Sequence, residues 1–333
     1  MRKRIGKVGR SVLIIYAFLA ILFFFILTLT VREEKSKYYE EKVKAVKKTK
    51  EALEIIKNYR IDYGIPIDII NDPKETGLIF HPYSILTYER TNLTLSQASL
   101  SPNFSAFFIE LLKDKKLKEN DTIILFLDGS FPALNISLLS ALEVLRIRPI
   151  IFLQVASISY GANDPNFTFL EIFKILKDNK IFDFTLEYAS LGGKKDIGEG
   201  LSKEAREFIK EKINYYKIKP IIAENESLQI LLKKDLLKNF NYKGIIALSY
   251  DLPFKEKDKK RFFYHFNNPF ILKEEYDIKD ELFKGRLFYE KRYSLFYTSL
   301  FLIILIFLLY LIIKYDLEYY LTKKKEEIYE EGI

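Results

Sequence analysis

Two long apolar runs, one near each end of the 333-residue chain, enclose a middle part in which short apolar runs alternate with amphipathic ones. The first run covers residues 11–31 (SVLIIYAFLAILFFFILTLTV) and the second covers residues 294–313, and neither contains a charged residue. A stretch of about 20 apolar residues is long enough to cross the roughly 30 Å hydrocarbon core of a bilayer as a helix. The pattern therefore predicts two transmembrane helices.

The residues that flank the first run indicate an anchor and an orientation. The tail of residues 1–10, MRKRIGKVGR, is basic and contains no acidic residue, which favours the cytoplasmic side of the membrane. The run exceeds the apolar region of a normal signal peptide, and LTLTVREEK offers no small-residue cleavage site. We therefore expect a two-pass protein of the cell membrane. Both termini, including residues 314–333, are then cytoplasmic, and the main domain is extracytoplasmic.

Between the two runs, the pattern predicts a stalk and then an α/β domain. Residues 32–60 are rich in Lys and Glu with a thin apolar stripe, which indicates a helical stalk next to the membrane. Residues 61–293 form the domain, and the last part of them, after residue 250, is expected to lead back to the membrane. The expected helices are 102–117, 132–145, 168–179, 202–216 and 226–239, and the expected strands are 121–127, 148–156, 183–189, 219–223 and 244–250.

This alternation fixes the predicted fold class. Strands that alternate with helices are joined by right-handed crossovers and pair in parallel. We therefore predict an open, mostly parallel, Rossmann-like α/β sheet of about five strands with helices on both faces, flanked by the two transmembrane helices.

Composition removes several classes of chemistry. The chain has no cysteine, which excludes disulfides, thiolate metal sites and cysteine nucleophiles. Its two histidines, His81 and His265, leave little room for a His-rich zinc site. The net charge is +8, but the basic residues are interleaved with acidic ones, as in residues 40–57, which is typical of a solvated helix face. No nucleic-acid motif accompanies this charge, so we expect no nucleic-acid partner.

Polar, glycine-rich loops follow three of the predicted strands. They are residues 128–135 (DGSFPALN), 157–167 (SISYGANDPNF) and 190–202 (SLGGKKDIGEGLS). Ligands of open parallel sheets bind outside the carboxyl ends of the strands, and Pro132 at the first helical position would leave free amides for a phosphate or carboxylate. We therefore predict that the loops meet in one anion-binding crevice, formed by Asp128, Gly129, Ser130, Asn135, Gly161, Asn163, Asp164, Gly192, Gly193 and Asp196.

Other interpretations of the same loops stay open. An ordinary, well-capped strand-to-helix turn also accounts for the first loop. Ser130 lies on a sharp turn, but LDGSFP is not the G-x-S-x-G nucleophile elbow, and the P-loop spacing is absent. The carboxylates of Asp128, Asp164, Glu171 and Asp196 offer the oxygen ligands that hard divalent cations prefer, although carboxylates are common at strand ends. The sequence names no cofactor and does not decide whether the chain catalyses a reaction.

The same loops carry a resemblance to a known family. The blocks GSFPALN (129–135), SYGANDPNFTFLE (159–171) and SLGGKKDIGEGLS (190–202) are similar, in order and spacing, to blocks of the poly-gamma-glutamate system protein family. The likeness extends over about residues 77–225 and the N-terminal anchor, with a looser match at SPNFSAF (101–107). The resemblance implies a part in the synthesis or export of poly-γ-glutamate, an anionic surface polymer, and implies no particular reaction.

Together these observations give one expected function and one alternative. We expect a membrane-anchored accessory protein of poly-γ-glutamate biosynthesis or export that binds an anionic ligand, either the polymer or a small anion, at the strand-end loops. Its partners would be the membrane and components of the synthase or exporter. The alternative is a membrane-anchored hydrolase or transferase that uses Ser130 or a carboxylate-bound metal. A purely structural scaffold would bind no ligand at all.

Overall fold

The computed structural model describes residues 8–254, 258 and 260–315. Within it the chain forms two compact units, one made of the segments up to Lys35 and from Tyr289 onward, the other of Ser36–Phe288. Most of the predicted tails, residues 1–7 and 316–333, lies outside the described residues.

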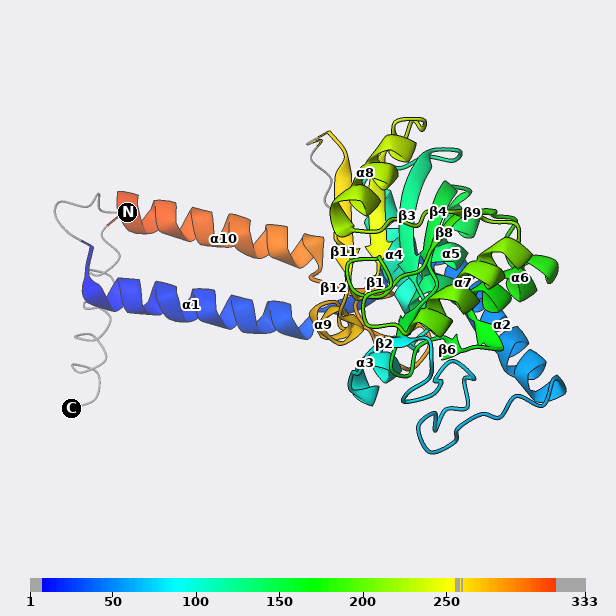
Figure 1. Ribbon diagram of the computed structural model, residues 1–333. Helices are drawn as coiled ribbons and strands as arrows, with labels where there is room; N and C mark the ends of the chain where they lie inside the picture. Colours follow the sequence, from blue (N-terminus) through cyan, green and yellow to red (C-terminus); the bar gives the residue numbers. More distant parts are fainter. Residues whose placement is uncertain (1–7, 255–257, 259, 316–333) are drawn as a thin grey trace, which may run out of the picture. The chain divides into compact units, whose positions relative to one another are not determined.

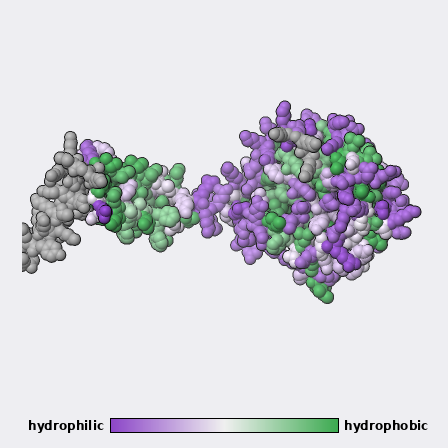
Figure 2. Space-filling model, turned by 60° about the vertical axis from the view of Figure 1, so that its left-hand side comes forward, coloured by the Kyte–Doolittle hydropathy of each residue, from purple (hydrophilic) through white to green (hydrophobic). Residues whose placement is uncertain are grey.

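The first unit contains the two apolar helices. Helix α1 (Arg10–Leu29) and helix α10 (Leu295–Lys314) are both 20 residues long, and most of their large apolar side chains are exposed. Their hydrophobic surface is green in Figure 2. Exposed apolar side chains around a whole helix are typical of a membrane span. By length and composition, both helices could therefore cross a membrane, as the sequence predicts.

These two helices are held together along their length and at one end. The rings of Phe23 and Phe301 stack with their centroids 4.4 Å apart. Strand β1 (Arg32–Lys35), which follows α1, pairs antiparallel with strand β12 (Tyr289–Arg292), which precedes α10. Figure 1 shows α1 and α10 side by side, with β1 and β12 near one end of the pair. The two helices of this unit therefore lie together as a pair.

The second unit is built on a six-stranded sheet in which every neighbouring pair of strands is parallel. The order across the sheet is β11-β10-β3-β4-β8-β9. The predicted α/β class and parallel pairing are confirmed. The strands are β3 (Thr122–Asp128), β4 (Arg148–Gln154), β8 (Leu186–Ser190), β9 (Lys219–Pro220), β10 (Gly244–Leu248) and β11 (Phe262–Phe266).

Both faces of this sheet are covered, because both sets of alternating side chains on its central strand are buried. Ile124 and Phe126 of β3 pack in a cluster with Leu237 of a covering helix. Ile123 and Leu125, which point to the opposite face, are also buried. The helices around the sheet (Figure 1) are α2 (Tyr39–Asp62), α4 (Phe104–Asp114), α5 (Pro132–Leu145), α6 (Phe169–Asp178), α7 (Lys203–Tyr215) and α8 (Glu226–Leu237).

The starts of these helices follow from their capping residues. Pro132 stands at the first turn of α5, where its missing N–H costs no hydrogen bond. Thr168 and Glu171 form a reciprocal capping box on α6. The side chains of Ser202 and Asn225 accept backbone N–H groups of α7 and α8. Because these signals are local, the predicted starts of the four helices agree with the structure to within a residue or so.

The predicted stalk is corrected by the structure. Helix α2 belongs to the same compact unit as the sheet and packs against α4 and α5. Its apolar stripe is buried there, with Ala45, Val46, Ala52 and Ile56 fully inaccessible. The stripe is therefore the contact face of a core helix.

Two further segments differ from the sequence expectation. The chain after residue 250, expected to lead back to the membrane, first adds β11 to the edge of the sheet and then forms α9 (Pro269–Glu275). Residues 61–100, left without assigned elements, contain strand β2 (Thr87–Glu89) and helix α3 (Leu93–Ala98). Both segments border the carboxyl edge of the sheet, where a ligand would bind.

The packing of α2 gives a first testable prediction. Replacing the fully buried Ile56 by Ala leaves a cavity and should lower the free energy of unfolding by about 2–5 kcal/mol. Ile61 lies on the same helix but is 56% exposed, so Ile61→Ala should cost far less. Urea unfolding of the full-length protein in detergent measures both variants. Equal, small losses for the two would contradict the core position of α2.

Candidate functional site

The order of the strands marks one place on the sheet. From β3 the chain proceeds through β4 and β8 to β9 at one edge, and it then returns to place β10 on the other side of β3. In open α/β sheets, ligands bind outside the carboxyl ends of the strands at such a reversal. The carboxyl ends of β3 and β10 are therefore the first place to look for a site.

The three predicted loops do meet at this edge. The carbonyl oxygen of Gly129 accepts hydrogen bonds from the Ala162 amide, at 2.7 Å, and from Ser157 Oγ, at 3.1 Å, which joins the first loop to the second. The amide of Ala156, the residue directly before the second loop, donates to the carbonyl oxygen of Leu191 in the third loop, at 3.0 Å. The expected meeting of the loops is confirmed.

The first loop wraps around its own carboxylate. Asp128 is fully buried; its Oδ1 accepts the Ser130 amide at 2.8 Å, and its Oδ2 accepts Ser130 Oγ at 2.9 Å and the Tyr250 amide at 2.7 Å. Burial raises the pKa of Asp128 to about 7, against the opposing effect of these hydrogen bonds. The side chain of Asn135 donates to the Asp128 carbonyl at 2.7 Å. The turn therefore surrounds the carboxyl group of Asp128, which belongs to the chain itself, where the sequence predicts an external anion.

The third loop repeats this arrangement around Asp196. Its Oδ1 accepts Ser190 Oγ at 2.6 Å and the Gly192 amide at 3.1 Å. Its Oδ2 accepts the side-chain amide of Gln229 at 2.8 Å and lies 2.5 Å from Nζ of Lys233, and both members of this ion pair are buried. A buried ion pair is tolerated only when further hydrogen bonds surround it, as they do here.

The polar residues of the second loop serve to fix the backbone around His81. Asn163 donates to the His81 carbonyl and accepts the His81 amide. Asp164 accepts the Asn166 amide at 2.8 Å and lies 3.5 Å from the His81 ring. Gly161 leaves no space for a side chain, because a Cβ there would stand 2.2 Å from Ser157 Oγ. These residues shape the edge of the sheet through contacts within the chain.

The predicted site residues thus lie together, but all of them are buried. Ser130, the candidate nucleophile, donates to Asp128 and has no histidine as a hydrogen-bond partner among the described residues. Glu171, one of the candidate metal ligands, binds Lys212 and Tyr216. Within residues 8–254, 258 and 260–315, no group of three or more His, Cys, Asp or Glu side chains is placed to hold a metal ion.

An open cavity lies beside these loops, and we call it the edge crevice. Its volume is about 460 Å³, within the range of small-molecule sites. It is formed by β2, by the turns that follow β10 and β11, and by the third loop. Its lining residues are Tyr88, Glu89, Leu95, Lys194, Tyr250, Asp251, Asn267 and Asn268.

The edge crevice is connected to the buried Asp128 through hydrogen bonds of its lining residues. The Tyr250 amide, which Asp128 accepts, belongs to a lining residue. Tyr88 is another lining residue, and its buried hydroxyl group lies beside Ser130 of the first loop. Burial, together with the nearby charge of Asp128, raises the pKa of Tyr88 well above its ordinary value. The phenol therefore stays protonated and able to donate.

The described lining of the crevice contains more negative than positive side chains. Lys194 Nζ lies 2.5 Å from a carboxylate oxygen of Glu89, so these two charges neutralise each other. The carboxylate of Asp251 accepts the Lys195 amide at 3.1 Å, and no ion pair to it is found among the described residues. The side chain of Lys195 instead pairs with Glu199 at 3.0 Å. The lining residues that the structure describes therefore carry one net negative charge.

Sequence reasoning missed most of this lining. Tyr88 and Glu89 fall in the segment left without assigned elements, and Asn267 and Asn268 follow β11, which was not predicted. Asp251 could have been found from the sequence, because it follows the predicted strand 244–250. Ligands of open parallel sheets bind at the carboxyl ends of the strands, and this rule, which selected the other loops, also selects Asp251.

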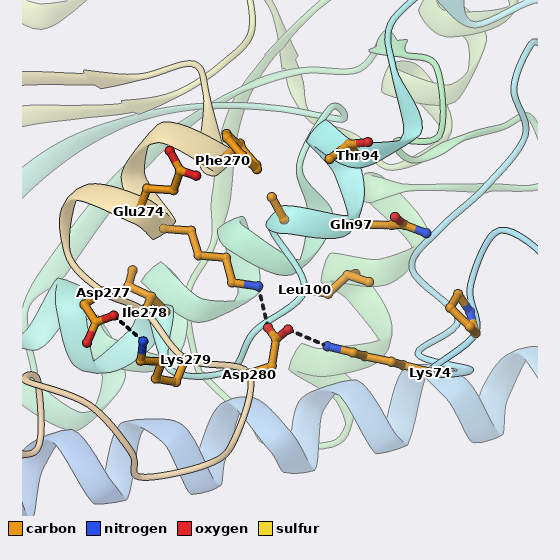
Figure 3. A pocket seen from close by; sticks show the side chains of 13 residues that line it. Lys74, Thr94, Gln97, Leu100, Phe270, Glu274, Asp277, Ile278, Lys279 and Asp280 are labelled. Carbon is orange, nitrogen blue, oxygen red and sulfur yellow. Dashed lines mark hydrogen bonds and ion pairs between the residues drawn. The ribbon is translucent and has the colours of Figure 1, made fainter.

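A second cavity, of about 580 Å³, lies between α3 and α9 (Figure 3). Its charged side chains are engaged with one another: Asp280 binds Lys74 at 3.0 Å and Lys273 at 2.6 Å, and Asp277 binds Lys279. Figure 3 shows the ion pair between Lys74 and Asp280 at the cavity. Because these charges are already paired, and because the edge crevice is lined by the residues that follow β10 and β11 directly, the edge crevice is the better candidate for the functional site.

Comparison with protein-family models, curated proteins and solved structures finds no match for this chain. Its function therefore has to be inferred from its own residues and their geometry.

Asp128 gives the second prediction, which concerns pH. Because its folded-state pKa, about 7, lies above its ordinary 3.8, the folded protein binds this proton more tightly than the unfolded chain. Its contribution to stability is complete below pH 4 and is lost as the pH rises towards 7. Between pH 5 and pH 8 this amounts to about 2–3 kcal/mol.

Unfolding of the full-length protein in detergent at pH 5 and pH 8 measures this change. Asp128→Asn removes the titrating group, so its two unfolding free energies should differ less than those of the unmodified protein. Asp235→Asn, at an exposed position on α8, should keep the original difference. An unchanged difference in Asp128→Asn would show that Asp128 stays ionised across this range.

Proposed function

We propose that the chain is a membrane-anchored accessory protein of a poly-γ-glutamate system, and that it binds a γ-glutamyl ligand in the edge crevice. The observation that carries the binding role is an open crevice at the point where the strand order reverses. The sequence blocks at 129–135, 159–171 and 190–202 support the polymer as the source of the ligand. Its partners would be components of the polymer synthase or exporter.

Binding without catalysis fits the positions of the candidate reactive groups. Ser130 is inaccessible, and a nucleophilic serine needs an oxygen that the substrate can reach. A carboxylate of the ligand would instead find Lys194 and the side-chain amides of Asn267 and Asn268 at the crevice. The anion expected from the sequence is therefore proposed for this surface and not for the interior of the loops.

The proposed role requires the α/β unit, with its Rossmann-like sheet, to face outward from the cell membrane. Two helices that could span the bilayer flank the unit in the sequence. The basic residues 1–10 favour a cytoplasmic N-terminus. With two spans, the C-terminus is then cytoplasmic as well.

Reporter fusions test this topology. An alkaline phosphatase reporter inserted after Asn239, in an exposed turn, should be active, because that enzyme matures only outside the cytoplasm. A fluorescent or β-galactosidase reporter fused after Ile333 should be active in the cytoplasm. Activity of both on the same side would contradict the two-pass arrangement.

Ligand binding tests the function itself. Full-length protein in nanodiscs should bind short γ-linked glutamate oligomers more tightly than α-linked oligomers of equal length and charge, as measured by calorimetry. Lys194→Ala should weaken binding of the γ-linked oligomer about tenfold, or about 1.4 kcal/mol. Lys195→Ala is the matched control, because Lys195 is adjacent, exposed and not part of the lining. No preference for the γ linkage would contradict the proposed function.

A further inference from the structure

We propose that the edge crevice recognises the protonated amine of a small ligand, and that Asp251 is the carboxylate with which this amine pairs. That the amine belongs to a glutamyl unit rests on the proposed function. The recognition of an amine rests on the crevice alone. The glycine-rich loops predict an anion at this edge of the sheet, so this inference concerns the opposite charge.

The balance of charge in the lining carries the inference. Glu89 and Lys194 form an ion pair at 2.5 Å, while Asp251 lines the same crevice without an ion pair among the described residues. A carboxylate at the wall of a cavity attracts a cation more strongly than it would in open water, because the protein around it screens less. The carboxylate of Asp251 therefore offers the crevice's place for a cationic group of the ligand.

The position of Asp251 is fixed before any ligand arrives. Its Oδ2 accepts the Lys195 amide at 3.1 Å, which ties it to the third loop. Its carbonyl oxygen accepts Ser249 Oγ at 2.9 Å, which holds the turn after β10. Because these contacts are made within the protein, the carboxylate loses little freedom when a ligand binds.

The neutral groups of the crevice suit the rest of such a ligand. Tyr88 lines the crevice, but its hydroxyl oxygen is inaccessible beside Ser130, so the side-chain amides of Asn267 and Asn268 are the neutral groups that a ligand meets. Asn268 uses its Oδ1 to accept the Phe270 and Ile271 amides at the start of α9, which directs its remaining hydrogen-bonding capacity, the NH₂ group, to other partners. An amine with a nearby carbonyl or carboxylate satisfies these groups together.

Three small probes test the inference on full-length protein in nanodiscs. L-glutamate carries the amine and two carboxylates, glutarate is the same skeleton without the amine, and putrescine is an amine without a carboxylate. Calorimetry should show binding of L-glutamate and putrescine and at least tenfold weaker binding of glutarate. If glutarate binds as tightly as L-glutamate, or if neither amine binds, the inference is wrong.

The same probes separate this inference from the proposed function. Binding of putrescine but of neither L-glutamate nor γ-linked oligomers would support amine recognition and contradict the poly-γ-glutamate role. Binding of γ-linked oligomers with glutarate equal to L-glutamate would support the role and contradict amine recognition.

A substitution locates the amine. Asp251→Asn keeps an oxygen for the Lys195 amide but removes the charge, so the affinity for L-glutamate and for putrescine should fall at least tenfold. Asp235→Asn, an exposed aspartate on α8 outside the crevice, should change neither. Thermal unfolding checks that both variants fold; if Asp251→Asn does not, the probe comparison on the unmodified protein still decides. Unchanged affinities in a folded Asp251→Asn would overturn the assignment to Asp251.

Discussion

The burial of Asp128 is the constraint on which the carboxyl edge of the sheet depends. A carboxylate taken out of water needs several hydrogen bonds to stay there, and it finds them in the Ser130 amide and hydroxyl and in the Tyr250 amide. The first two belong to the turn after β3, and the third belongs to the turn after β10. The side chain of Asp128 thus joins β3 to β10, the two strands between which the sheet order reverses. It also holds the backbone of Tyr250, which lines the edge crevice.

Asp196 is buried in the third loop in the same way, and the turn around its carboxylate accounts for the number of glycines in that loop. To turn around the carboxylate, the loop places Gly192, Gly193, Gly198 and Gly200 at positive φ, where other residues are strained. At Gly193 a Cβ would also come within 2.8 Å of the Glu199 carbonyl oxygen. These glycines therefore serve the loop's own geometry, and a side chain at Gly193 would disturb the fold as well as any ligand.

Much of the fold could be predicted because its signals are local. The alternation of buried strands with capped helices gave α5 at residues 132–145 and the start of α7 after Ser202, as the structure has them. The role of the loops could not be predicted in the same way. A turn that holds an external anion and a turn that holds its own aspartate share the same glycines, prolines and amides, and only the fold shows that Tyr250 closes over Asp128. An amphipathic helix likewise looks the same whether its stripe faces a core, as in α2, or another partner. Strand β11, at the edge of the sheet, was missed because FFYHF shows no alternation of apolar and polar residues. All five of its residues are partly exposed.

The two ends of the α/β unit are tied together by another buried charge. Lys42 donates to Ser36 Oγ, to the Leu287 carbonyl and to Glu110, and the Ser36 amide donates to the carbonyl oxygen of Phe288. The chain enters this unit at Ser36 and leaves it at Phe288, so its entry and exit are one rigid feature. Breaking the contact would leave the Lys42 ammonium buried without a partner, which is costly. Lys42 therefore fixes the entry and the exit of this unit to each other through contacts that are made within the unit.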